Sequence, residues 1–290
     1  MQIFLNGLVS GLTLSVLATA FSSVYLPTRV FHVALGGIYA ASPFLAWTLL
    51  RFGFPWPAIA GVVVLCAGLL SVLCEMINHA PLDRRKASSG AHLVSSLGIY
   101  LIIVQSIALI WGNETKVLRT GIDAGFSWAD ISLTRSQVCA ATVSGVCLLG
   151  YWLWLRFSIL GLKFRALADN PAQLALFGYN TGRLRLVSFA IAGAFCAASS
   201  LVVSYDVGFS PHGGMYAVLL AVVAVIIGGR QSLFWGPLFG GVILGITRAG
   251  AVWFLSARWQ EAVTYLLLAL FLFILPEGLS GKKMRLEAQA

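Results

Sequence analysis

The feature that most constrains this chain is a succession of apolar windows, each about as long as a bilayer core is thick. A helix needs about 20 apolar residues to cross the roughly 30 Å of hydrocarbon, where no water is present to satisfy a free backbone amide. The windows therefore predict membrane-spanning helices. They fall at 3–25, 31–50, 56–77, 91–112, 137–155, 186–206, 209–229, 233–253 and 261–276.

Composition favours a membrane protein over a soluble domain. Of the 290 residues, 59% are hydrophobic and 10% are charged, whereas about a quarter of a soluble domain is charged. The net charge of +9 does not indicate a nucleic-acid partner, because the basic residues lie at the ends of apolar windows and not on one face. We expect a lipid bilayer around a single all-α domain, residues 1–290, folded as a polytopic membrane helix bundle of about 8–9 transmembrane helices.

Two details affect the number of crossings. In the seventh window only 215–227 is continuously apolar, and Gly208, Pro211, Gly213 and Gly214 precede it. No Lys or Arg precedes the first window, so we expect a retained first span and not a cleaved signal peptide.

The basic residues also predict the orientation of the bundle. If the segment 156–185 is cytoplasmic and the windows alternate, 13 of the 19 Lys and Arg residues fall on the cytoplasmic side and the other six outside. An excess of Lys and Arg inside is the usual pattern of multi-span proteins. This assignment places the N-terminus outside and the C-terminus in the cytoplasm.

The motifs of catalysis and energy coupling are missing from the sequence. It contains no GxxxxGK[ST], HExxH or GxSxG, and its five Cys fall inside apolar windows. Glu75, Asp206 and Glu261 lie at window ends, whereas ion-coupled transporters carry carboxylates at mid-membrane. We therefore expect no enzyme activity, no catalytic residue and no metal site. Any transport would draw its energy from another chain.

Small residues recur at helix-packing spacing. Gly7 and Gly11 form one GxxxG pair, and Gly236 with Gly240 and Gly241 with Gly245 form two more. Glycine lets two helix backbones approach closely in lipid. Packing alone explains these pairs.

The cytoplasmic segment 156–185 predicts two short helices. Phe164 and Leu167 share one helical face, and that helix must stop before Pro171. A second helix begins well there, with Asn170 as N-cap, Pro171 in its first turn and Gln173 completing a capping box. It runs through Leu174 and Phe177 to Gly178, which can adopt the left-handed conformation. Such a helix either lies on lipid headgroups or docks on a cytoplasmic partner.

The same segment resembles the cytoplasmic loop of bacterial permeases that import branched-chain amino acids, urea and short amides by ATP-driven transport. GLKFRALADNPAQLALFGYNTGRLR, 161–185, matches that pattern at Gly161, Arg165, Ala166, Ala168, Asn170, Ala175, Gly178 and Asn180. The segments 228–245, 276–281 and VFHVALGGIYAASPF in the second window resemble further family segments, in the right order. Two residues depart from the pattern, since His32 replaces the usual Asn and Gln231 a usual Gly.

The resemblance implies a permease subunit of an ABC importer in the bacterial inner membrane. Two ATPase subunits that bind ATP and Mg²⁺, a second permease of a different chain, and a periplasmic solute-binding protein are its implied partners, and this chain carries no cofactor. The loop would couple to the ATPases through Gly161, Arg165, Ala166, Asn170, Pro171, Gln173, Leu174, Phe177 and Gly178. The alternative is a stand-alone secondary transporter or facilitator for a small polar solute.

The translocation path is expected at interrupted helices, because unpaired backbone is tolerated only beside protein or a watery cavity. We expect a weakly polar lining rather than charged clamps. Tight helix packing is the alternative role for the glycines. The candidate residues are His32, Gly36, Gly37, Gly213, Gly214, Gly228, Gly229, Gly236 and Pro237.

Overall fold

The computed structural model describes residues 1–119, 125–128, 131–229, 232–275 and 278–279, and this part of the chain is mainly helical. In chain order the elements are α1 (Gln2–Thr28), α2 (Leu35–Arg51), α3 (Trp56–Cys74), the π-helix η1 (Glu75–His79), α4 (Ala80–Arg84), α5 (Ser89–Trp111), β1 (Gly125–Trp128), β2 (Ile131–Thr134), α6 (Arg135–Phe157), α7 (Ile159–Asp169), α8 (Pro171–Leu176), α9 (Thr181–Val207), α10 (Gly213–Gly228), α11 (Trp235–Phe254), the 3₁₀ turn η2 (Ala257–Trp259) and α12 (Gln260–Ile274).

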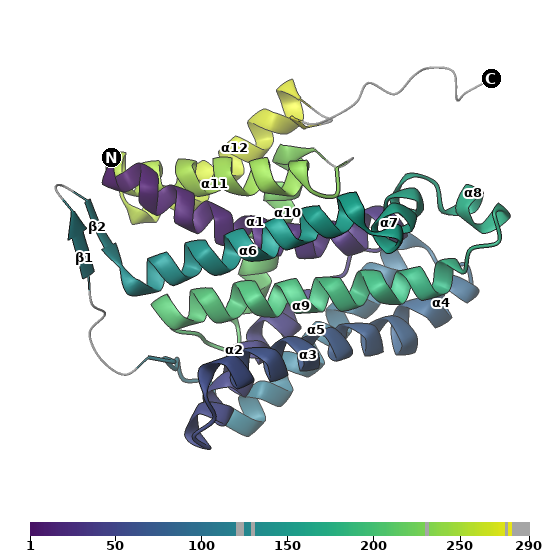
Figure 1. Ribbon diagram of the computed structural model, residues 1–290, viewed down its shortest axis with the longest axis horizontal. Coiled ribbons are helices and arrows are strands. Elements are labelled where there is room, and N and C mark those ends of the chain that lie inside the picture. The colour runs from purple at the N-terminus through teal and green to yellow at the C-terminus, as the bar shows by residue number, and fades with distance from the viewer. Residues whose placement is uncertain (120–124, 129–130, 230–231, 276–277, 280–290) are drawn as a thin grey trace.

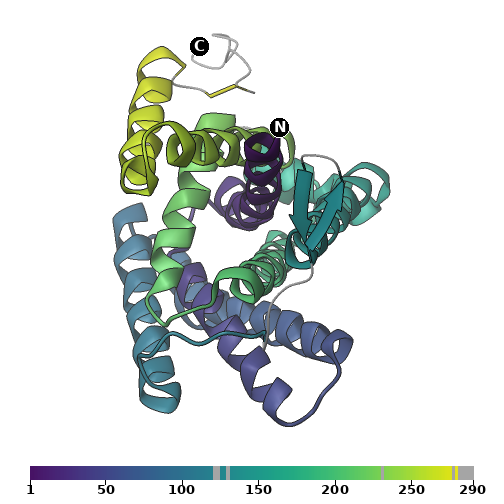
Figure 2. The same cartoon turned by 90° about the vertical axis from the view of Figure 1, so that its left-hand side faces the viewer.

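The long helices run side by side along the longest dimension of the molecule. α1, α6 and α9 lie horizontally in Figure 1 and are seen nearly end-on in Figure 2, whereas α10 runs vertically in both views and so crosses the bundle. The N-terminus and the β1–β2 hairpin lie at one end of the bundle, here called the hairpin end. α7 and α8 lie at the opposite end, here called the α8 end (Figure 1).

Seven helices of the described part are long and apolar enough to cross a membrane. They correspond to seven of the nine windows expected from the sequence, which confirms a polytopic helical membrane fold. The other two windows, 31–50 and 209–229, form the shorter helices α2 and α10, of 17 and 16 residues. Gly208 and Pro211 account for the late start of α10, because the chain there is extended and Phe209 exchanges backbone hydrogen bonds with Lys116.

α1 lies in the middle of the bundle and contacts α6, α9, α10 and α11. A helix surrounded by others needs an apolar or small residue on every side, and α1 is buried almost continuously from Thr13 to Pro27. Its first half packs on α11 through glycines. A Cβ on Gly7 would lie 2.8 Å from Ile246 Cα, and one on Gly11 2.8 Å from Val242 Cα. The predicted small-residue pairs therefore allow close helix contact, as expected.

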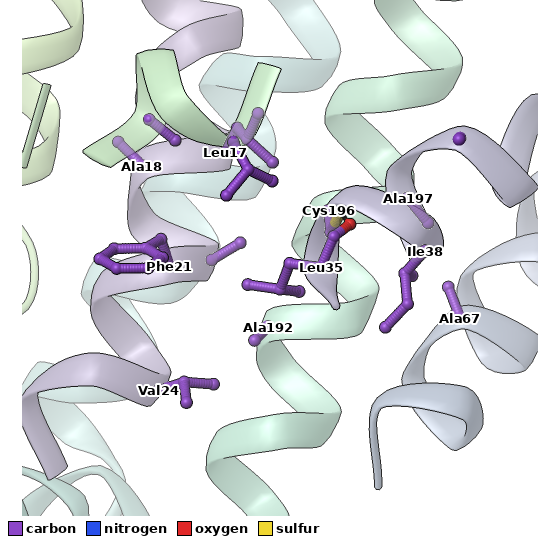
Figure 3. Close-up of a cluster of buried hydrophobic side chains, with 14 of the residues drawn as sticks. Leu17, Ala18, Phe21, Val24, Leu35, Ile38, Ala67, Ala192, Cys196 and Ala197 are labelled. Atoms are coloured by element: carbon purple, nitrogen blue, oxygen red, sulfur yellow. Dashed lines mark hydrogen bonds between the residues drawn. The ribbon is translucent and has the colours of Figure 1, made fainter. Parts of the chain in front are cut away.

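The largest hydrophobic cluster runs along the bundle, from Val24 near the end of α1 to Phe209, just past the end of α9. Leu17, Phe21 and Val24 from the second half of α1 meet Leu35 and Ile38 of α2, with Ala192 and Cys196 of α9 beside them (Figure 3). These side chains are almost fully buried.

The hairpin is the one element of strand structure in the described residues. β1 and β2 pair antiparallel, with Gly125 opposite Thr134, and Thr134 then caps α6 in a capping box with Gln137. The side chain of Gln2 holds the hairpin to the start of α1, because it exchanges two hydrogen bonds with the backbone of Ser132. These bonds hold β2 against the start of α1.

Candidate functional site

The predicted cytoplasmic segment forms α7 and α8, which dock on the bundle at the α8 end. Phe164 and Leu167 are 0% and 1% exposed, so the shared face expected from their spacing is the buried face. The Phe164 ring packs on Trp154 of α6 at 5.5 Å between centroids. Leu167 clusters with Leu174 of α8 and Leu184 of α9. This cluster gives α8 the supporting surface that so short a helix requires.

The ends of α8 follow the sequence prediction with one difference. The Asn170 side chain accepts hydrogen bonds from the backbone N–H groups of Ala172 and Gln173, both at 3.1 Å, which confirms the N-cap. The expected return bond from Gln173 is not formed, because the Asn170 N–H donates to Ala166 at the end of α7. Gly178 has φ +81°, as predicted for the residue that ends this helix.

Most of the residues expected to couple to a partner are exposed. Leu176 and Phe177 are 87% and 79% exposed, so α8 ends in an apolar tip that projects from the α8 end (Figure 1). Gly161 and Leu174 are buried, and Asn170 is half-buried. Gly161 lets α7 approach the end of α6, where a Cβ would collide with the Trp154 carbonyl. The exposed members are Arg165, Ala166, Pro171, Gln173, Phe177 and Gly178.

A cavity of about 650 Å³ occupies the hairpin-end half of the bundle. Its wall combines the first half of α1, the first turns of α6, the last turns of α9 and α11, and the start of α10. In the view of Figure 2, α11 lies above α9, and α10 runs vertically along one side of the bundle. The volume is in the range of small-molecule sites, about 300–1,000 Å³.

Two of the predicted pathway residues, Gly213 and Gly214, line this cavity. The other predicted pathway glycines lie at close helix contacts outside the lining. A Cβ on Gly36 would lie 3.1 Å from the Gly214 carbonyl oxygen, and one on Gly37 would lie 3.0 Å from Ile103 Cβ. The remaining contact joins the end of α10 to the start of α11 and contains Gly228, Gly229 and Gly236. Pro237 follows in α11 and is buried.

His32 lies away from the cavity, in a chain of three buried histidines at the α8 end. His32 Nδ1 lies 3.2 Å from His79 Nε2, and His79 Nδ1 lies 3.2 Å from His92 Nδ1. His79 uses each ring nitrogen for a different neighbour, so the rings form a line and do not converge on one point. The described residues include no group of three or more His, Cys, Asp or Glu side chains arranged to hold a metal.

A buried ion pair lies close to this histidine chain. Arg185, early in α9, donates from Nε to Glu75 of η1 at 2.7 Å and from Nη1 to Asp83 of α4 at 2.9 Å. Glu75 was expected at the end of a window, but the sequence did not indicate its partner 110 residues away. The pair fixes the start of α9 to η1 and α4.

Two charged residues of the cavity wall were not among the predicted pathway residues. Asp206 was expected at a window end, and Arg248 is one of the six basic residues that the expected orientation counts outside, yet both line the cavity. The lining is therefore not limited to weakly polar groups as expected. The available signal was a lone arginine inside an otherwise apolar helix, because such charges in membrane spans usually face a functional interior.

Comparison with known proteins yields one family along most of the chain. Residues 3–274 match the family described as branched-chain amino acid transport system / permease component. A permease protein LivH of a high-affinity branched-chain amino acid transport system, from Escherichia coli K12, is 24% identical over 300 residues, covering 97% of this chain and 96% of that protein. The corresponding permease protein BraD of Pseudomonas aeruginosa is 24% identical over 297 residues, with the same coverage.

Further similarities extend to a sugar import permease and to one solved structure. The fructose import permease protein FrcC of Rhizobium meliloti is 28% identical over 272 residues, covering 88% of this chain and 71% of that protein. A chain in the structure of PsaBC from Streptococcus pneumoniae in complex with Fab superposes with a TM-score of 0.54 at 11% identity, covering 96% of this chain and 93% of that chain. This last similarity concerns the fold alone.

Proposed function

Since this chain belongs to the family of permease components of branched-chain amino acid transport systems, we propose that the solute it passes is a branched-chain amino acid. The chain is a multi-pass membrane permease subunit of an ABC importer for small solutes. The observation that carries the solute assignment is the family match over residues 3–274. Urea and short amides are the alternative solutes.

The proposal includes the partners that drive and supply this permease. Two ATPase subunits hydrolyse ATP with Mg²⁺ at the α8 end, a periplasmic solute-binding protein delivers solute at the hairpin end, and a second permease chain completes the pore in the bacterial inner membrane. Family membership supports an ATPase and a binding protein in general terms. The excess of Lys and Arg in the segments next to α8 supports a cytoplasmic α8 end.

The apolar tip of α8 supports docking on a protein groove. Leu174 holds α8 on the bundle, while Leu176 and Phe177 point away from it almost fully exposed. A helix lying on lipid keeps its apolar face toward the bilayer, whereas this tip projects along the long axis beyond the spanning helices (Figure 1). Large apolar side chains on a short, supported helix are suited to fill a groove on a neighbouring subunit.

The position of the cavity supports alternating access. The cavity lies in the hairpin-end half, where its lining on α1 ends at Leu17, and the rest of α1 toward the α8 end is almost continuously buried. In the proposed orientation this is a state closed toward the cytoplasm, ready to receive solute from the periplasmic side. Closure of the ATPase pair on ATP would move α8 and rearrange the helices that join the two halves.

The test is transport by proteoliposomes of defined composition. Vesicles with the complete transporter should take up L-leucine only with ATP inside and binding protein outside, and vesicles with this chain alone should show no flux. Phe177→Asp should abolish co-purification of the ATPases, while Phe54→Asp, which changes an exposed aromatic residue in the α2–α3 turn, should preserve it. Leucine flux through this chain alone, or normal ATPase association of Phe177→Asp, would contradict the proposal.

A further inference from the structure

The lining of the cavity includes one acidic side chain, Asp206, and one basic side chain, Arg248, which come from different helices. Asp206 lies in the last turn of α9, and Arg248 lies on α11. In the view of Figure 2, α11 lies above α9. Both side chains are half-buried, which makes them accessible to a solute in the cavity.

Asp206 has spare capacity to accept hydrogen bonds. Its Oδ1 accepts a bond from Ser136 Oγ on α6 at 2.8 Å. No Lys, Arg or His of the described residues forms an ion pair with it. A carboxylate offers about four lone-pair sites on two oxygens. Most of that capacity is therefore available to a positively charged ligand group.

Arg248 is held in place without being neutralised. Its Nη1 donates to Thr264 Oγ1 at 2.9 Å and its Nη2 donates to the Tyr216 hydroxyl at 2.8 Å. Thr264 is itself fixed by a bond to the Gln260 carbonyl. An arginine has five N–H donors, so three remain, and no carboxylate of the described residues pairs with them. The guanidinium is thus oriented by neutral groups and remains ready for an anion.

Other opposite charges of this molecule do pair with each other, as Arg185 shows. Arg185 binds two carboxylates directly, whereas Asp206 and Arg248 share a cavity without forming an ion pair. Keeping two opposite charges apart in a partly buried space is costly unless something else compensates them. A ligand with one positive and one negative group of its own would compensate both.

The rest of the wall is aliphatic where such a ligand would place its side chain. Val9, Leu14, Val202, Val203 and Leu220 line the same cavity. Neutral sugars and urea offer hydrogen bonds to this wall but leave both charges uncompensated. An α-amino acid with an aliphatic side chain satisfies the cation, the anion and the apolar surface together.

We propose that this cavity is a solute subsite for zwitterionic aliphatic α-amino acids, in which Asp206 receives the ammonium group and Arg248 the carboxylate. The assignment rests on the proposed function and deepens it by naming the groups that select the solute. Arg248 would bind the carboxylate through two of its remaining N–H donors. Such bidentate pairs, with two parallel hydrogen bonds, are the strong form of the arginine–carboxylate interaction.

The test measures occupancy of the cavity in the assembled transporter, independently of the solute-binding protein. Ala217 on α10 lines the cavity and is half-buried, so the thiol of an Ala217→Cys variant reports access by its rate of reaction with N-ethylmaleimide. The chain without this change supplies the background of the five native Cys. L-Leucine should protect the thiol, whereas leucinamide, 4-methylpentanoate, urea and D-ribose should not at the same concentration, because each lacks one or both charges.

Charge-removing variants then assign the two groups. In the reporter background, Asp206→Asn and Arg248→Gln should each weaken leucine protection about tenfold, or about 1.4 kcal/mol, and Arg248→Lys should weaken it less. Arg258→Gln and Glu261→Gln, which remove the same charges at exposed positions outside the lining, should leave protection intact. Size-exclusion profiles and ATPase co-purification verify assembly of each variant.

Three outcomes would overturn the assignment. They are absence of leucine protection in the reporter chain, equal protection by leucine and leucinamide or D-ribose, and equal protection in the Asp206→Asn and Arg248→Gln variants. The comparison of ligands needs no change to either charge, so it decides the case even if those variants fail to assemble. ATP-driven leucine uptake by the same preparation tests the proposed function separately, and uptake without protection refutes this subsite alone.

Discussion

Removing Arg185 should destabilise the α8 end by an amount that the structure allows us to work out. Glu75 is 2% exposed and its contact with Arg185, 15% exposed, is 2.7 Å long. Leaving one member of such a buried pair alone costs about 3–5 kcal/mol. The second contact, to Asp83 at 60% exposure, adds at most about 1 kcal/mol, because water screens it. We therefore expect Arg185→Met to lower the free energy of unfolding by about 4 kcal/mol.

The measurement is thermal unfolding of the purified chain in detergent, followed by loss of the monodisperse species. A loss of about 4 kcal/mol corresponds to a fall in Tm of about 8 °C for a large chain, at about 2 °C per kcal/mol. Arg183→Met is the matched control, since Arg183 lies two residues away in α9, is exposed, and its side chain has no ion pair among the described residues. Its Tm should change by less than about 1 °C.

A double variant separates the ion pair from simple loss of packing. Glu75→Gln with Arg185→Met leaves no uncompensated charge in the buried position, so it should recover most of the stability lost by Arg185→Met. If Arg185→Met unfolds within about 2 °C of the parent, or if the double variant is no better than the single one, the argument that a buried lone carboxylate dominates this region is wrong.

Two further predictions concern the α1–α11 contact and the cap of α8. Gly11→Leu should prevent accumulation of the chain in the membrane, because its Cβ would meet the α11 backbone at 2.8 Å. Overpacking of this kind costs about 1–3 kcal/mol or more. The control Gly61→Leu, with open space around its Cβ, should accumulate normally. Asn170→Ala should remove the cap of α8, which costs about 1 kcal/mol of helix stability, and so weaken ATPase affinity about fivefold in a titration. The control Asn180→Ala, which uncaps the long α9, should leave that affinity unchanged.

The sequence predicted the long helices well because their signal is local. A window of about 20 apolar residues suffices to indicate a spanning helix, and seven windows matched such helices. The direction in which α10 crosses the bundle could not be predicted in the same way. Hydropathy reports that 215–227 is apolar, but the tilt depends on which neighbours α10 meets. Gly214, near its start, meets Gly36, which is far away in the chain.

The α8 region was predictable for the same reason, whereas the cavity was not. Asn170 and Gly178 act on backbone groups within a few residues, so their roles as cap and helix end follow from spacing. Asp206 and Arg248 are 42 residues apart in the chain, and their presence in one cavity depends on how α9 and α11 pack around α1. A search for charges inside apolar helices would have found Arg248, but nothing local indicates that it shares a cavity with Asp206.

α9 connects the two regions that the proposed transport cycle must link. It is 27 residues long and contains no proline, so it spans about 40 Å as one rigid element. Arg185 ties its first turns to η1 and α4, and Asp206 lies in its last turn at the cavity. Near its middle, Gly193 brings α9 against α3, where a Cβ would lie 2.8 Å from Ser71 Cβ.

A rigid helix held closely at its middle tilts about that contact when one end moves. If the ATPases displace α8, the start of α9 moves with it, and Asp206 moves in the opposite sense relative to Arg248 on α11. The distance between the two charges would then change with the nucleotide state. An amino acid could no longer reach both charges at once, so it would be released although its contact with each single charge is as strong as before. Arg185→Met should accordingly uncouple ATP hydrolysis from leucine uptake even at temperatures where the variant remains folded.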